Sequence, residues 1–259
     1  MITSSQNSKI KLVRALLGRA KERREAGAFV VEGVRLVEEA VNSDWKFQLA
    51  LYDASLTERG KSQVERLTAR GVDVEIVSES LMKSLSETET PQGILAVLSD
   101  SRLPIPDTPN FLLIPDQIRD PGNLGTLLRT AAAAGVQAAL LPPETTDAFA
   151  PKVVRSGMGA HFQLPIHAMT WDEIEAQTKD LQVYLADMDG KSCWETDLRQ
   201  PLALIVGGEA EGASEEARKL ADQQISIPMT GKMESLNAGV AGSMLMFEVV
   251  RQRSVNSKQ

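Results

Sequence analysis

Three polar segments of this chain each follow a short apolar run, and each carries side chains that could serve chemistry. The first holds Asn123 and Arg129, six residues apart at the start of a predicted helix. The second holds Glu209 in a glycine-rich stretch, and the third holds Asn237. An amide, a guanidinium and a carboxylate could together bind and orient a polar ligand. We therefore ask whether the fold brings them together.

Each of these residues also has an ordinary structural explanation. An arginine such as Arg129 more often forms a surface salt bridge. A carboxylate such as Glu209 is often placed at the start of a helix, where the helix dipole favours it. An asparagine such as Asn237 often hydrogen-bonds to nearby backbone. Taken singly, these explanations are the commoner ones, and only the combination of the three segments favours a site.

Composition excludes several classes of chemistry. Two histidines, His161 and His167, and one cysteine, Cys193, leave little material for a zinc site or a Cys–His nucleophile. The segment GGEAEG lacks both the Lys-Ser/Thr of a P-loop and the spacing G-x-G-x-x-G. No apolar run approaches the ~20 residues needed to span a membrane, and the first residues lack an apolar signal core. We expect a soluble cytoplasmic protein without a membrane partner.

The charge distribution is uneven. A net charge of −7 argues against broad, non-specific nucleic-acid binding. Residues 1–106 hold 15 basic and 15 acidic groups, whereas residues 107–259 hold 13 and 20. The first 24 residues contain seven basic groups and only one acidic group, Glu22. This segment could contact phosphates, although a solvated helix face is the plainer explanation.

The first hundred residues predict a small α/β sandwich. Helix and strand signals alternate there, starting with one basic amphipathic helix that ends at Gly27. The predicted helices are 4–26, 34–41, 57–70 and 79–85, and the predicted strands are 29–31, 47–52, 72–77 and 93–98. Residues 101–110 contain three prolines, which predicts a linker between domains 1–100 and 111–259.

The remaining residues predict a mostly parallel sheet covered on both faces. The predicted strands are 111–114, 136–141, 162–166, 183–186 and 202–206, and the predicted helices are 122–134, 150–158, 171–178 and 214–221. Residues 187–200 look polar and irregular. Ligands of such sheets bind beyond the carboxyl ends of the strands, where the three polar segments are expected to meet.

A C-terminal helix is predicted from Ser235, which we expect to be its N-cap. Its apolar positions share one face at steps of three and four residues: Leu236, Val240, Met244, Phe247 and Val250. Gly239 and Gly242 lie in its interior, where a glycine costs about 1 kcal/mol relative to alanine. Their presence predicts a close approach by another helix or by a ligand.

At this point a family resemblance is evident. The segments NLGTLLRTAAAAG, GGEAEG and IPMTGKMESLN resemble, in order and spacing, the three motifs of the SpoU branch of the SPOUT RNA methyltransferases. The match spans about residues 110–252. SxxNxKIK at 4–11 and FVVEGxRLVEEA at 29–40 more weakly resemble an L30e-like substrate-binding domain. One departure is Ala238-Gly239, where the family often has Val-Ser.

The resemblance implies an α/β fold in which an L30e-like sandwich precedes a mostly parallel sheet with a C-terminal trefoil knot. It implies a homodimer packed through the knot region, with the reaction site near the subunit boundary. The implied reaction is 2′-O-methylation of a ribose in RNA by S-adenosylmethionine, without a metal. The residues implied to bind this cofactor are Gly207, Gly208, Ile227, Met229, Leu236 and Asn237.

The resemblance also implies roles for the polar residues. Arg129 would be catalytic, and because a guanidinium stays protonated, we expect it to clamp a phosphate and stabilise an alkoxide rather than act as a base. Asn123, Ser235 and Asn237 would position the ribose and the loop. Glu209 would orient Arg129 or brace the knot.

The N-terminal domain would then select the RNA through phosphate contacts, for which the candidates are Lys9, Lys11, Arg14, Lys21, Arg23, Arg24 and Arg35. The resemblance favours ribosomal RNA of the large subunit over transfer RNA. Two other functions stay open: a non-catalytic RNA-binding or ribosome-assembly factor on this scaffold, and an ordinary doubly wound nucleotide-binding enzyme.

Overall fold

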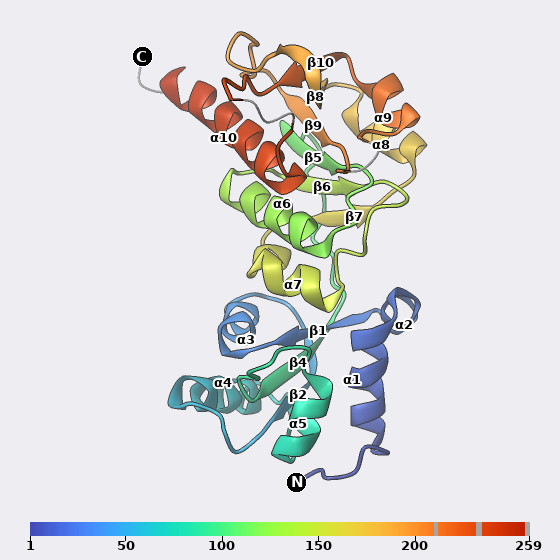
Figure 1. Ribbon diagram of the computed structural model, residues 1–259. Helices are drawn as coiled ribbons and strands as arrows, with labels where there is room; N and C mark the ends of the chain where they lie inside the picture. Colours follow the sequence, from blue (N-terminus) through green and yellow to red (C-terminus); the bar gives the residue numbers. More distant parts are fainter. Residues whose placement is uncertain (210–211, 232–234, 257–259) are drawn as a thin grey trace. The chain divides into compact units, whose positions relative to one another are not determined.

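The computed structural model describes residues 1–209, 212–231 and 235–256 (Figure 1). Internal contacts divide the chain into two compact units. The first comprises Met1–Ser101 together with Phe149–Phe162, and the second comprises Arg102–Ala148 and the chain from Gln163 onward. Within the described ranges, no helix is long and apolar enough to cross a bilayer.

The first unit is a four-stranded sheet with helices on both faces. The strand order is β1-β4-β2-β3, with β2 and β3 parallel and the other pairs antiparallel. One apolar core lies beneath α3 and α4, and a second lies beneath α1 and α5. The elements are α1 (Ser8–Gly18), α2 (Ala20–Ala26), β1 (Ala28–Glu32), α3 (Val34–Val41), β2 (Phe47–Tyr52), α4 (Glu58–Ala69), β3 (Asp73–Ile76), α5 (Glu79–Leu85) and β4 (Ile94–Ser99).

The single helix predicted over residues 4–26 is two helices. The backbone turns to an extended conformation at Arg19 (φ −111°, ψ 139°), between α1 and α2. Arg23 is buried and donates a hydrogen bond of 2.7 Å to the carbonyl oxygen of Leu16 in the last turn of α1. Its guanidinium thus satisfies a carbonyl near the end of α1, a contact that helical periodicity cannot show.

The segment Phe149–Phe162 packs with the first unit, although the sequence placed it in the second domain. It contains α7 (Pro151–Gly157) and the short 3-10 helix η1 (Ala160–Phe162). Phe149 lies 4.9 Å from Phe29, and Phe162 lies 6.0 Å from Trp45, measured between ring centroids. An alternation of helix and strand signals does not show which sheet a helix packs against. The sequence pattern therefore could not place this segment in the first unit.

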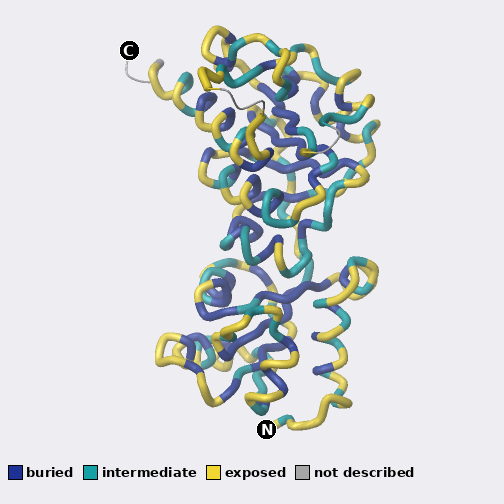
Figure 2. The backbone as a smooth tube through the Cα atoms, viewed as in Figure 1, coloured by how far each residue is buried: buried dark blue, intermediate teal, exposed yellow. Residues whose placement is uncertain are grey.

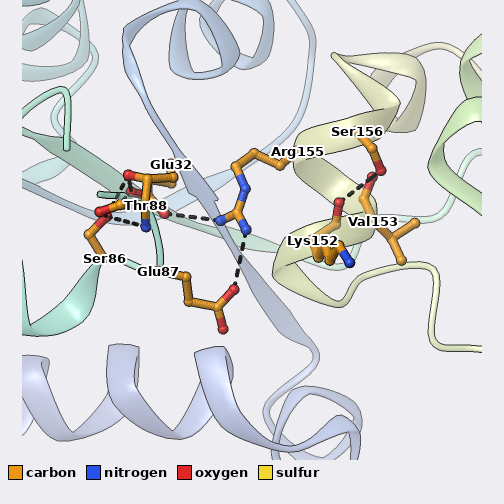
Figure 3. Close-up of polar contacts among 8 residues, drawn as sticks. All are labelled: Glu32, Ser86, Glu87, Thr88, Lys152, Val153, Arg155 and Ser156. Carbon is orange, nitrogen blue, oxygen red and sulfur yellow. Dashed lines mark hydrogen bonds and ion pairs between the residues drawn. The ribbon is translucent and has the colours of Figure 1, made fainter. Parts of the chain in front are cut away.

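Polar contacts add to this packing (Figure 3). Arg155 of α7 donates to the carboxylates of Glu32 and Glu87, each at 3.3 Å. The hydroxyls of Ser86 and Thr88 also donate to Glu32, whose side chain is 8% exposed. The carboxylate of Glu32 is therefore satisfied from several sides, as a buried charge requires. Phe149–Phe162 is an integral part of the first unit.

The second unit is built on a six-stranded parallel sheet of order β10-β8-β9-β5-β6-β7. Its central strands β5 and β9 are buried throughout (Figure 2). The elements are β5 (Phe111–Pro115), α6 (Pro121–Ala133), β6 (Ala138–Leu141), β7 (Ile166–Ala168), α8 (Trp171–Thr178), β8 (Gln182–Ser192), β9 (Leu202–Val206), α9 (Glu215–Leu220), β10 (Gln223–Ser226) and α10 (Ala238–Asn256). Strand β8 extends well beyond its predicted end at residue 186.

Helix α10 begins later than predicted and buries the opposite face. It starts at Ala238, and the side chain of Asn237, rather than Ser235, accepts the hydrogen bond from the Val240 N–H at 3.2 Å. The predicted apolar stripe is largely exposed: Leu236, Val240, Met244 and Phe247 are 38%, 46%, 46% and 49% exposed. Leu245, Met246 and Val249 are buried instead. Because α10 has apolar residues all round, periodicity alone could not select the buried face.

One of the two glycines predicted to lie inside this helix, Gly242, has the predicted explanation. A Cβ on Gly242 would lie 2.4 Å from Leu127 of α6 and 3.0 Å from Val206 of β9. Figure 1 shows α10 lying beside α6, and the hydroxyls of Thr130 and Ser243 are 2.9 Å apart across this contact. The glycine allows a helix approach that any side chain would obstruct.

A buried carboxylate, Asp116, joins three elements at one edge of the second sheet. It follows β5, its N–H donates to Val206 O at 2.9 Å, and its Oδ2 accepts the Ser214 N–H at 2.7 Å. The residue is fully buried, and its Oδ1 has no hydrogen-bond partner in the part of the chain that is described. Burial raises the pKa of this carboxyl, against the hydrogen bonds from Ser214, which lower it.

The raised pKa predicts how stability depends on pH. Because folded Asp116 binds its proton more tightly than the unfolded residue, its contribution to stability is greatest at low pH and is lost as pH rises through the raised pKa. An asparagine at this position cannot ionise, so the Asp116→Asn variant does not lose stability in this way as pH rises. We expect the free energy of unfolding of this variant, relative to the unchanged protein, to increase from acid to neutral pH in urea titrations.

Asp197 provides the control. Arg199 lowers the pKa of the Asp197 carboxyl to about 2, so the free energy of unfolding of Asp197→Asn, relative to the unchanged protein, should show the opposite trend: it should fall from acid pH to ~pH 5 and stay constant above it. A constant or falling difference for Asp116→Asn would contradict the assignment of a buried charge.

Candidate functional site

The carboxyl ends of neighbouring parallel strands form one wall of a large cavity in the second unit. Its volume is about 670 Å³, within the range of about 300–1,000 Å³ that is common for small-molecule sites. It lies between the segments that follow β9 and β10 and the start of α10. All six residues predicted to bind the cofactor line it: Gly207, Gly208, Ile227, Met229, Leu236 and Asn237.

The two glycines after β9 are required by close backbone packing. A Cβ on Gly207 would lie 2.7 Å from the Ala213 backbone nitrogen, and one on Gly208 would lie 2.5 Å from the Gln117 carbonyl oxygen. The segment folds back on itself, because the Gly208 N–H donates to Gly212 O at 3.1 Å. Only glycine lets the backbone form this wall, so a ligand can lie directly against main-chain groups.

Asn123, Glu209 and Asn237 form one hydrogen-bonded cluster, which we call the polar triad. The side-chain amides of Asn123 and Asn237 both donate to Glu209 Oε1, at 2.5 and 2.7 Å. Asn237 also donates to Asn123 Oδ1 at 3.0 Å. The triad joins the first turn of α6, the segment after β9 and the cap of α10. Residues 114 positions apart in sequence therefore meet, as the sequence predicted for the three polar segments.

The structure places the other two predicted catalytic residues differently. Ser235 is exposed on the wall of the large cavity. Arg129 is exposed on α6 and has no hydrogen bond or ion pair with any residue that the structure describes. Glu209 is bound by the two asparagines and not by Arg129. Of the two roles expected for Glu209, the geometry supports bracing the loops.

One wall of the cavity was not predicted from the sequence. Asp187, Met188 and Asp189, in the second half of β8, line it together with Arg218 of α9. Arg218 forms an ion pair of 2.9 Å with Asp187. The residues had been included in an irregular segment, because their mixed polarity hides a strand. A partner that follows 31 positions later in sequence leaves no local signal.

Two of the seven phosphate-contact candidates are already occupied. Lys9 lies 2.7 Å from Asp73 and 2.8 Å from Glu75, whose hydrogen bonds raise the pKa of the lysine. Arg23 is buried against Leu16, so its guanidinium is not available to an RNA, which corrects that assignment. The other five candidates are exposed: Lys11, Arg14, Lys21, Arg24 and Arg35.

The histidines do not contribute to the cavity. His161 is buried in the first unit, and His167 Nε2 lies 2.8 Å from Leu103 O. Among the residues with described positions, no group of three or more His, Cys, Asp or Glu side chains could hold a metal ion. Among the described residues, the lining of the cavity offers backbone groups, amides, hydroxyls, carboxylates, the guanidinium of Arg218 and apolar side chains.

Comparisons with known proteins agree with this geometry. Residues 110–247 match the SpoU rRNA Methylase family, and residues 7–96 match an MRM3-like substrate binding domain. The chain is 34% identical to the 23S rRNA (guanosine(2553)-2′-O)-methyltransferase RlmP of Bacillus subtilis, over 96% of this chain and 98% of that protein. It is 33% identical to the 23S rRNA (uridine(2479)-2′-O)-methyltransferase of Streptomyces viridochromogenes, over 96% and 92%.

A solved structure extends the likeness to three dimensions. The AdoMet-bound rRNA methyltransferase from Sinorhizobium meliloti superimposes with a TM-score of 0.85, at 30% identity, over 96% of this chain and 97% of that one. The matches cover both units, the predicted motifs and the wall of the cavity. The chain belongs to the SpoU rRNA methylase family.

Proposed function

We propose that this protein transfers a methyl group from S-adenosylmethionine to the 2′-hydroxyl of a ribose in ribosomal RNA. The observation that carries the proposal is the convergence of all six predicted cofactor residues on one cavity, directly beside the polar triad. The two relatives compared above are named for 2′-O-methylation of 23S rRNA, and the superimposed structure is named as AdoMet-bound. A cytoplasmic location suits a chain with one cysteine.

The cavity suits this cofactor in size and chemistry. The glycine wall formed by Gly207 and Gly208 gives a flat ligand direct access to main-chain groups. Met229 and Leu236 are 39% and 38% exposed, and a bound nucleoside would cover their apolar side chains. The carboxylate of Asp189 gives part of the wall an acidic character that favours a cationic ligand. When bound, S-adenosylmethionine supplies an activated methyl group on a sulfonium.

The chain's own residues must activate the acceptor. A ribose hydroxyl is a weak acid, so the reaction needs either a base or stabilisation of the developing alkoxide. Asn123, Ser235 and Asn237 are placed to orient the ribose. Arg129 supplies a permanent positive charge that can hold a phosphate and stabilise the alkoxide. Orienting the hydroxyl in line with the methyl carbon accounts for a large part of the acceleration.

A homodimer completes the site in this proposal. Val240, Met244 and Phe247 form an apolar stripe on the exposed side of α10, each close to half exposed. Such a stripe is typical of a surface that binds a partner. Thr130 of α6, which follows Arg129 in sequence, contacts Ser243 of α10, which precedes Met244. A second copy packed on α10 would bring further groups toward Arg129. We also propose that the segments after β9 and β10 form the trefoil knot implied by the family.

The first unit selects the RNA in this proposal. The exposed Lys11 and Arg14 are one helical turn apart on α1, and Lys21 and Arg24 are similarly spaced on α2. Charges at this spacing can contact successive phosphates. Deleting residues 1–100 would be a poor test, because Phe149–Phe162 would lose the core against which it packs.

Arg129→Ala tests the catalytic role. We expect methyl transfer to ribosomal RNA to fall by about 10²- to 10³-fold, because one charge that stabilises an alkoxide is removed. The affinity for S-adenosylmethionine, measured separately by calorimetry, should not change. Arg199→Ala, an exposed arginine paired with Asp197, is the matched control and should keep full activity. Full activity of Arg129→Ala would end this assignment.

Phe247→Glu tests the dimer. A carboxylate on the apolar stripe would have to be buried at the interface, so we expect sedimentation to show a monomer and methyl transfer to be lost. Gln177→Glu adds the same charge on the exposed side of α8 and should remain dimeric. If the unchanged protein sediments as a monomer and is fully active, the proposed subunit boundary is wrong.

A double variant, Lys11→Glu with Arg14→Glu, tests RNA selection by α1. We expect weaker binding to ribosomal RNA and a shallower dependence of log K on log salt, by about one unit for each lost phosphate contact. Cofactor affinity should be unchanged. Lys61→Glu with Arg70→Glu, two exposed positions of α4 and its end, is the charge-matched control. Equal RNA affinities for the two double variants would count against α1.

A further inference from the structure

A second, smaller pocket adjoins the polar triad at Asn123 and Glu209. Its volume is about 110 Å³, and its lining includes Gln117, Ile118, Asp120, Asn123, Gly208 and Glu209. Gly208 and Glu209 line the large cavity as well. The third member of the triad, Asn237, lines the large cavity but not the small pocket. The triad is therefore a partition between two compartments, and a methyl transfer needs one compartment for the donor and one for the acceptor.

The backbone of Gln117 is held in an unusual conformation at this pocket. Its φ of +52° lies in the left-handed region, which costs a non-glycine residue free energy. The Gln117 carbonyl oxygen would lie 2.5 Å from a Cβ on Gly208, so the two segments are pressed together. The side-chain amide of Gln117 has no hydrogen bond with any described residue, although it lines the pocket. Such conformations concentrate at functional sites.

The lining favours an uncharged, flat ligand over a phosphate. The carboxylates of Asp120 and Glu209 would repel an anion. Arg119 also lines the pocket, but its guanidinium is bound to Glu144 at 3.2 Å. Ile118 is buried and adds an apolar surface. An amide offers one donor group and one acceptor beside this surface, which matches the hydrogen-bonding edge of a nucleobase.

The position of the small pocket also suits a nucleobase. In a nucleotide, the carbon that bears the 2′-hydroxyl is bonded directly to the carbon that bears the base. A ribose held at the triad, with its hydroxyl toward the large cavity, therefore has its base within reach of the small pocket. The base must leave the RNA stack to enter it, as in other enzymes that act on single nucleotides.

We propose that the small pocket, here called the acceptor pocket, receives the base of the nucleotide whose ribose is methylated, and that the Gln117 amide recognises the edge of this base. The inference rests on the proposed function and adds a residue that determines specificity. Gln117 contacts the substrate base but not the reacting atoms. In this proposal, the left-handed backbone of Gln117 holds its side chain at the pocket.

Gln117→Gly separates recognition from strain. Glycine adopts the left-handed conformation readily, so this variant should fold at least as stably as the unchanged protein. The probes are four transcripts of 23S rRNA that differ only in the base at the nucleotide methylated by the unchanged protein. The unchanged protein should prefer one base by about tenfold or more in kcat/KM. Gln117→Gly should reduce that preference to about threefold or less, with unchanged affinity for S-adenosylmethionine.

Two further variants sharpen the test. Met158→Gly replaces another left-handed residue, at the end of α7, and should leave the base preference unchanged. Gln117→Glu keeps the size of the side chain but loses the N–H donor, so it should change the order of preference among the four bases. If Gln117→Gly methylates RNA with undiminished base preference, the inference is overturned. If the unchanged protein has no base preference, it is overturned as well. If the unchanged protein methylates no RNA, the proposed function fails and this inference fails with it.

Discussion

The parallel pairing of β9 with β5 on one side and β8 on the other is the constraint on which the site depends. Val206, the last residue of β9, pairs with Pro115 of β5 and with Ala186 of β8. Chain segments that leave neighbouring parallel strands must emerge at the same edge of the sheet. The pairing therefore gathers residues from three distant parts of the sequence before any side chain makes a contact. The apolar sequence of β9 secures it, since every residue of the strand is buried.

Two carboxylates at this edge serve different purposes because their burial differs. Asp116 is fully buried: its carboxylate accepts the N–H of Ser214, the N-cap of α9, and its backbone N–H donates to Val206 of β9, at the cost of removing a carboxyl from water. Glu209 borders both compartments and receives two side-chain amides on one oxygen. Asp116 fixes the edge of the sheet, and Glu209 joins the segments that leave this edge. The glycines after β9 make room for both arrangements.

The sequence was sufficient for those parts of the fold that local periodicity and motif spacing determine. The strand from Leu202 to Val206, the convergence of the three polar segments and the close approach at Gly242 are all found in the structure. The family resemblance was needed for the identity of the cofactor residues, because backbone-mediated binding leaves few side-chain signals. The roles of Arg129 and Ser235 stay predictions, since neither has a polar contact with a described residue that assigns one.

Other features could not be predicted because they depend on contacts between distant residues. The buried face of α10 is set by α6 and β9, and the placement of Phe149–Phe162 is set by an aromatic core in the first unit. The burial of Arg23 follows from the break between α1 and α2. Gln117 gave no signal in the sequence, because a glutamine carries no preference for the left-handed region.

A calorimetric titration with S-adenosylmethionine tests whether the segment after β9 is the wall of a cofactor cavity. We expect the folded protein to bind the cofactor and Gly207→Ala, whose Cβ would meet the backbone of Ala213, not to bind it. Gly231→Ala should bind normally, because no atom of the described residues lies within 4 Å of its Cβ position. Absence of binding by the folded protein, or equal affinity in both glycine variants, would contradict the account.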